Sequence, residues 1–260
     1  MPTLKAVTYD DFAASSWRRP ESYMFAADEP ITALGAVEVS KAMFSMAIGF
    51  VPDNEDFLPV AVQGIKNGQN LLVDDNGRWI ENYVPAIYRS HPFRLAKNNE
   101  GQHFLCINED SKLVSDDGSA EPFYSAPREL SENTRKVFDL LVENERDRML
   151  ATKICKSLNY AGVIEPWPMR LETEGEIQEI TGLFRISEEK LNSLDAEDFA
   201  QLREGGSILL AYCQLLSMQH IYKLGKLAWN REKSIKQKNQ NEPAALSFGN
   251  DSGTLSFGNL

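Results

Sequence analysis

The chain of 260 residues contains little cysteine, little histidine and no long apolar run. Its three cysteines, Cys106, Cys155 and Cys213, are widely spaced, and each lies within an apolar pattern. An odd number of separated cysteines is typical of reduced core thiols and argues against a disulfide-stabilised secreted scaffold. Because 42% of the residues are hydrophobic, we expect a core that needs neither disulfides nor a structural metal.

Positive charge is also scarce. The chain has 27 basic and 38 acidic residues, for a net charge of −11. Such a chain has no overall attraction for phosphate backbones, so we expect no nucleic-acid partner. The most apolar stretch, residues 208–218, falls short of the ~20 residues that cross a bilayer, which predicts no membrane insertion. The first residues lack the apolar core of a secretory signal, and together with the reduced cysteines this predicts a cytoplasmic location.

Turn signals and strand-like runs fill the first half of the chain. Asn67-Gly68 and Asp75-Asn76-Gly77 separate three short runs between residues 58 and 81, and both turns contain residues that accept a positive φ. We therefore predict a three-strand antiparallel meander. Further strands at 93–96 and 103–107 are expected to extend the same sheet. Residues 31–51 favour a strand, a short helix and another strand.

Helical patterns dominate the second half. Ser131 is placed to cap a long helix that ends near Gly162. Early strands and late helices predict an α+β fold, in which an antiparallel sheet with a β-meander in the N-terminal half is packed by helices mainly from the C-terminal half. After the long helix the patterns predict a hairpin and three helices, at residues 167–184, 188–194, 197–204 and 207–229.

We divide the chain into an irregular N-terminal arm (1–27), an α+β domain (28–230) and a disordered tail (231–260). The tail is polar and cannot bury enough apolar area to offset the cost of ordering. It contains Leu-Ser-Phe-Gly-Asn twice, which favours a duplicated contact for a partner, or a substrate of a modifying enzyme, over an inert terminus. The motif residues are Leu246, Phe248, Asn250, Leu255, Phe257 and Asn259.

The segment from residue 64 to residue 93, GIKNGQNLLVDDNGRWIENYVPAIYRSHPF, resembles the central signature of the bacterial SapC family. The likeness continues through residues 182–191 and 209–217 and covers roughly residues 28–230. It implies a link to a bacterial surface layer or to peptide transport, although a permease would need several membrane-spanning helices. Similar proteins tend to be encoded near flavin-dependent halogenases, cupin-like oxygenases and outer-membrane receptors, which implies an accessory role in handling a peptide or a nutrient. The family implies no agreed catalytic residues.

Aromatic rings, arginine and proline are concentrated between residues 79 and 93. Recognition surfaces have this composition, and the alternative is that the rings fill the core between sheet and helices. We predict a non-catalytic binding or adaptor protein that recognises a peptide or protein partner, needs no cofactor, and is accessory to peptide modification or nutrient uptake. The predicted binding residues are Trp79, Tyr83, Tyr88, Arg89, His91 and Phe93.

Two other functions stay open. His91 and His103, with Glu81 or Glu109, would supply ligands for iron or zinc in an oxygenase-like enzyme if strands brought them together. Their spacing is not diagnostic, and a packing role for each histidine is the alternative. The second is a structural protein associated with the surface layer. The sequence has no Gly-rich phosphate loop, dinucleotide fingerprint or serine nucleophile elbow in the required context.

Overall fold

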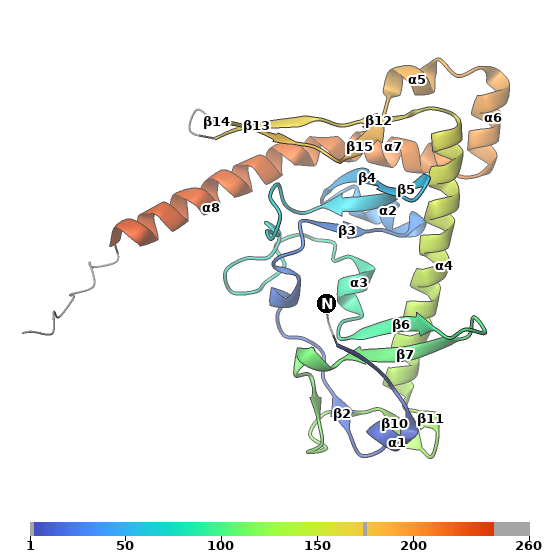
Figure 1. Ribbon diagram of the computed structural model, residues 1–260, viewed down its shortest axis with the longest axis vertical. Coiled ribbons are helices and arrows are strands. Elements are labelled where there is room, and N and C mark those ends of the chain that lie inside the picture. Colours follow the sequence, from blue (N-terminus) through green and yellow to red (C-terminus); the bar gives the residue numbers. More distant parts are fainter. Residues whose placement is uncertain (1–2, 174–175, 242–260) are drawn as a thin grey trace, which may run out of the picture.

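The computed structural model describes residues 3–173 and 176–241. Over these residues the protein has the predicted α+β fold, and every pair of described strands is antiparallel (Figure 1). None of the described helices is long and apolar enough to cross a membrane.

The larger sheet is built around one hairpin. Strands β4 (Ala47–Asp53) and β5 (Asp56–Val62) pair along their full length, and the turn between them places Asn54 at a positive φ of 55°. The free side of β5 pairs with β3 (Ile31–Ala33). Helix α2 (Ala36–Ala42) lies between β3 and β4, so the strand, short helix and strand predicted within residues 31–51 are confirmed. Two later strands, β12 (Ile164–Pro166) and β15 (Phe184–Ile186), complete the order β12-β15-β4-β5-β3.

The predicted meander between residues 58 and 81 is wrong in its second and third strands. Both turns form, with Gly68 at φ 70° and Gly77 at φ 76°. The chain between them makes a single antiparallel bridge, from Val73 to Trp79, instead of a ladder.

Side chains at two positions explain why this ladder does not form. The amide oxygen of the buried Asn70 accepts the N–H of Leu72 at 2.9 Å. The Asp74 carboxylate accepts the N–H groups of Asn76 and Arg78 at 2.9 and 2.8 Å. Asparagine and aspartate side chains thus take backbone donors that a strand ladder would use.

The strands predicted at residues 93–96 and 103–107 exist as β6 (Phe93–Lys97) and β7 (His103–Asn108). The expectation that they extend the larger sheet is wrong, because β3 already occupies the free side of β5. They form a second sheet of order β1-β7-β6, whose outer strand β1 (Leu4–Ala6) comes from the N-terminal arm.

The arm is more regular than predicted. It contains α1 (Tyr9–Phe12) and β2 (Ser16–Trp17), and β2 pairs with two strands from much later in the chain. The Trp17 ring is buried, and its Nε1 donates to Thr134 Oγ1 at 2.9 Å. The short strands in this region are β8 (Val114–Ser115), β9 (Glu121–Pro122), β10 (Tyr124–Ala126) and β11 (Glu129–Leu130).

The long helix is confirmed as α4 (Glu132–Tyr160), and Ser131 Oγ caps it by accepting the Thr134 N–H at 3.3 Å. The remaining predicted elements also form. They are the hairpin β13 (Met169–Thr173) and β14 (Glu176–Ile180), and the helices α5 (Glu188–Asn192), α6 (Ala196–Glu204) and α7 (Ser207–Ser217).

The prediction of a single helix over residues 207–229 is wrong, because α7 ends at Ser217 and a second helix follows. After a 3-10 turn (Met218–His220), α8 (Ile221–Asn241) continues past residue 229, so the expected start of the tail at 231 lies within a helix. The repeated motif at 246–250 and 255–259 lies outside the described residues.

Two hydrophobic clusters share α4. Leu141 packs in the smaller cluster beside the second sheet, whereas Ile154, Cys155 and Leu158 pack in the larger cluster. Figure 1 shows α4 running past both sheets. This helix therefore connects the two halves of the fold, and the segment around residues 83–93 lies where they meet.

A candidate binding cleft between two helices and the aromatic segment

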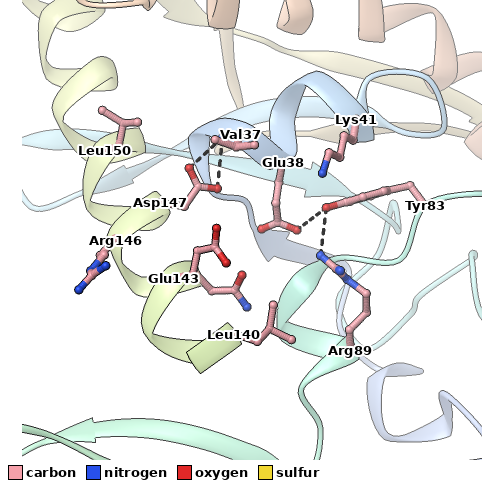
Figure 2. A pocket seen from close by; sticks show the side chains of 11 residues that line it. Val37, Glu38, Lys41, Tyr83, Arg89, Leu140, Glu143, Arg146, Asp147 and Leu150 are labelled. Carbon is pink, nitrogen blue, oxygen red and sulfur yellow. Dashed lines mark hydrogen bonds between the residues drawn. The ribbon is translucent and has the colours of Figure 1, made fainter. Parts of the chain in front are cut away.

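A cavity of about 350 Å³ opens between α2 (Ala36–Ala42), α4 and the segment that includes α3 (Ala86–Arg89) (Figure 2). We call it the α2–α4 cleft. The residues that line it are Val37, Glu38, Lys41, Tyr83, Arg89, Leu140, Glu143, Asn144, Arg146, Asp147 and Leu150.

Glu38 holds the aromatic segment against α2. Its Oε1 accepts the Tyr83 hydroxyl at 2.9 Å and the Ala86 N–H at 2.7 Å. Its Oε2 accepts the Gly35 N–H at 3.1 Å and so satisfies a free donor at the start of α2. Burial, and then the Glu38 charge, raise the pKa of Tyr83 above its usual range, so this phenol stays protonated and donates. Both carboxylate oxygens of Glu38 therefore already accept hydrogen bonds from the protein itself.

Asp147 ties α4 to the same end of α2. Its two carboxylate oxygens lie 2.9 and 3.2 Å from the Val37 N–H. A negative charge at a helix N-terminus is favourable because free N–H groups point toward it. This approach requires glycine at position 35, since a Cβ there would overlap the Asp147 carboxylate.

The cations of the cleft, in contrast, form no ion pairs with described residues. Lys41, Arg89 and Arg146 are exposed, and none makes an ion pair with a described residue. The Asn144 Nδ2 is buried and lacks a hydrogen-bond partner in the described part of the chain. The cleft therefore offers positive charge and an amide donor, with Glu143 as its uncommitted carboxylate.

Two of the six predicted binding residues line this cleft. The Arg89 guanidinium lies 5.7 Å from the centre of the Tyr83 ring, and its Nη2 donates to the Tyr83 hydroxyl at 3.4 Å. Figure 2 shows both side chains reaching toward Glu38 across the cleft. Trp79 fixes the backbone at Tyr83, because its Nε1 donates to the Tyr83 carbonyl at 2.8 Å.

The other three predicted residues are buried. Tyr88 and Phe93 are each 1% exposed, and Phe93 packs edge-on against Trp17 at 4.7 Å between ring centres. The Tyr88 hydroxyl lies 3.0 Å from Glu29 Oε2 and 2.9 Å from Gln63 Oε1. The alternative reading, rings that fill the core, therefore holds for these residues.

His91 stacks on Phe25, with ring centres 3.7 Å apart and planes 4° apart. Burial, and then the charge of Arg94, lower the pKa of His91 to about 4. Its buried Nδ1 has no hydrogen-bond partner among the described residues. The ring also lines a second cavity, of about 400 Å³, on the side of the N-terminal arm.

The two histidines of the alternative metal site do not come together. Phe93, two residues after His91, pairs with Ile107, whereas His103 pairs with Lys97 at the far end of the same two strands. Four residues along a strand span about 13 Å, which is too far for one ion to bridge. Within the described residues, no group of three or more His, Cys, Asp or Glu side chains is placed to hold a metal.

Comparison with protein families gives one result. The model of the family described as SapC matches residues 7–224. The chain belongs to the SapC family. Comparisons with curated proteins and with solved structures each gave no match. The SapC match includes the whole α2–α4 cleft and most of the N-terminal arm, which the resemblance in the sequence left outside.

Sequence reasoning missed the part of the cleft of this SapC protein that comes from the helices. Glu38 and Asp147 lie far from the aromatic segment in the chain. One local signal was available, because a glutamate three residues after a helix N-cap commonly accepts the N-cap N–H, and Glu38 stands in this position after Gly35. No signal in the sequence indicates that Asp147 reaches α2.

Proposed function

We propose that this SapC protein is a non-catalytic binding or adaptor protein that holds a peptide segment of a partner in the α2–α4 cleft. The cleft carboxylates Glu38 and Asp147 accept hydrogen bonds from the protein itself. A carboxylate in this state is a poor general base, because its lone pairs are already occupied. The groups left for a ligand are the three cations, the Asn144 amide donor and the carboxylate of Glu143.

The observation that carries the proposal is a set of cleft cations that make no ion pair with a described residue, in a chain of net charge −11. Lys41, Arg89 and Arg146 line one cleft with three carboxylates, of which two already accept hydrogen bonds from the protein, and none of the three cations makes an ion pair with a described residue. Exposed apolar side chains lie beside them, with Val37 57% and Leu150 43% exposed. This combination fits an extended segment that carries both acidic and apolar side chains.

The experiment is a titration of the full chain with short fluorescent peptides of matched length. One peptide alternates Asp with Leu, and its counterpart alternates Asn with Leu. We expect tighter binding of the acidic peptide, and a loss of affinity of about tenfold in the double variant Lys41→Ala, Arg89→Ala.

The matched control is Arg135→Ala, because Arg135 is exposed on α4 and does not line the cleft. Its affinity should equal that of the unaltered chain. Equal binding of the two peptides, or a double variant that binds as well as the control, would contradict the proposal. The duplicated tail motif as a second contact or a modification substrate, and a role accessory to peptide modification or nutrient uptake, remain predictions.

A further inference from the structure

Helix α7 presents an apolar stripe to solvent. Leu209, Tyr212 and Leu216 follow the spacing i, i+3 and i+7, which places them on one face of a helix. Their exposed fractions are 64%, 40% and 57%. Leu210 and Ala211, which the helical period turns away from this stripe, are buried in the larger core. The helix therefore carries apolar residues on both faces, and one face has no described partner.

Helix α8 continues this surface with aromatic residues and lysines. Tyr222, Lys226, Trp229 and Lys233 follow the spacing i, i+4, i+7 and i+11, and all four are exposed. Tyr222 is 80% and Trp229 47% exposed. Figure 1 shows α8 continuing from α7 and projecting away from the sheets. Together these residues and the α7 stripe form what we call the α7–α8 face.

The charge of α8 is opposite to that of the rest of the chain. It contains six of the 27 basic residues and one of the 38 acidic residues, so it carries +5 and the remainder carries −16 of the total of −11. The segment 188–204, which ends two residues before α7 begins, contains six acidic and two basic residues. A basic helix and an acidic segment thus lie at opposite ends of the α7–α8 face.

We propose that the α7–α8 face binds a second copy of this chain in an antiparallel, two-fold dimer, in which α8 of each copy lies on α7 and on the acidic segment 188–204 of the other. In a pair centred near His220, Trp229 of one copy falls between Leu209 and Tyr212 of the other. Lys233 then falls near the start of α7, next to the acidic segment that ends at Glu204. The two-fold axis repeats both contacts and closes the assembly.

Charge selects a second copy as the occupant. A second copy also carries a net charge of −11, so the attraction is local: the antiparallel pair brings the basic α8 of each copy to the acidic segment 188–204 of the other, whereas a lipid surface offers no such positioned carboxylates. Lys223 and Arg231 of α8 pair with Glu81 and Asp75 of their own chain. Lys226 and Lys233 make no ion pair with a described residue, so they are the cations that the segment 188–204 of the other copy would neutralise. A second copy of the chain therefore offers a complementary surface both to the apolar stripe and to the basic residues of α8.

Sedimentation equilibrium of the full chain over a range of concentrations tests this proposal. We expect a monomer–dimer equilibrium that weakens as salt increases. The double variant Leu216→Ser, Trp229→Ser should raise the dimer dissociation constant about tenfold or more. Lys233→Glu and Glu204→Lys should each raise it about fivefold at low salt, and their combination in one chain should restore it to near the original value.

The control is Lys153→Glu, which makes the same charge change at an exposed site on α4 outside this face. It should leave the dimer unchanged, and circular dichroism checks that every variant folds. A monomer at all concentrations, a dimer that the apolar double variant does not weaken, or no restoration in the charge-swapped chain would overturn the proposal. Binding of the monomer to phosphatidylserine vesicles through the same residues would also overturn it. None of these variants alters the α2–α4 cleft, so the result is independent of peptide binding there.

Discussion

In the aromatic segment, the hydroxyl groups of Tyr83 and Tyr88 form hydrogen bonds within the protein. The Tyr88 hydroxyl lies within hydrogen-bond distance of the buried Gln63 and of Glu29, and burial together with the Glu29 charge raises the pKa of Tyr88 above its usual range. Tyr83 behaves in the same way toward Glu38. A buried phenol that stays protonated keeps its hydrogen bond and avoids the cost of burying a charge.

His91 makes stability depend on pH. Its pKa is lowered from 6.5 to about 4 in the folded protein, so between these values the unfolded chain binds a proton more readily than the folded one. Its contribution to the free energy of unfolding is fully present above pH 6.5 and declines as the pH falls toward 4. Between roughly pH 7.5 and roughly pH 5 we expect a loss of about 2 kcal/mol from this residue.

Urea unfolding at the two pH values measures this effect, and His91→Phe is the matched variant because a phenyl ring keeps the stack on Phe25. The unaltered chain should lose about 2 kcal/mol more than the variant between the two pH values. Equal losses in the two proteins would show that His91 is as easily protonated in the folded state as in the unfolded one.

At the scale of elements, the contact between the first turn of α2 and helix α4 sets the shape of the cleft. Its free N–H groups are taken by Glu38 from within the helix and by Asp147 from α4. Either helix could form from its own periodicity. Their relative position is set by the close approach of the Asp147 carboxylate to the Gly35 backbone.

This contact predicts that removing the Asp147 carboxylate reduces the destabilising effect of a substitution at Gly35. Gly35→Ala should destabilise the protein by about 2 kcal/mol, because the new methyl group displaces the Asp147 carboxylate. The φ of Gly35 is −75°, so the backbone conformation itself accepts alanine. In an Asp147→Ala background the same substitution should cost much less.

Thermal or urea unfolding of the four proteins in this cycle gives the coupling free energy. A coupling near zero would mean that the carboxylate and the glycine do not depend on each other. Val37→Ala is a suitable control, because its side chain is 57% exposed and its N–H is kept.

At the scale of the whole molecule, α4 belongs to both hydrophobic clusters. Leu141 is buried in the smaller cluster and Leu158 in the larger one. The arm adds a second connection, because the Trp17 indole donates to Thr134 at the start of α4. Neither sheet can therefore lose its packing without exposing part of a helix that the other sheet also needs.

This sharing predicts one cooperative unfolding transition. Leu141→Ala and Leu158→Ala should each lower the free energy of unfolding by about 2–4 kcal/mol and shift the same transition. Calorimetry, compared with tryptophan fluorescence and far-ultraviolet circular dichroism, measures this. Two separated transitions, with each variant moving only one of them, would show that the clusters unfold independently.

Much of the element order was predictable because its signals are local. The cap at Ser131, the positive-φ turns at Gly68 and Gly77, and the helical periodicities act within a few residues of themselves. The structure separates the residues of the predicted binding segment, and their role in binding stays a prediction. Tyr83 and Arg89 line the cleft, whereas Tyr88, His91 and Phe93 are buried, since composition does not reveal which side of a turn faces the core.

By itself the sequence determined the α+β class, the start of α4, the β13–β14 hairpin and the SapC family, since each of these depends on neighbouring residues or on a linear pattern. Tertiary structure alone decided that β6 and β7 form a separate sheet, and that Glu38 and Asp147 complete the cleft. These outcomes depend on which backbone edges and donors are already occupied by residues distant in the chain, 45 positions apart for Glu38 and Tyr83 and 110 for Val37 and Asp147, and no local pattern carries that information.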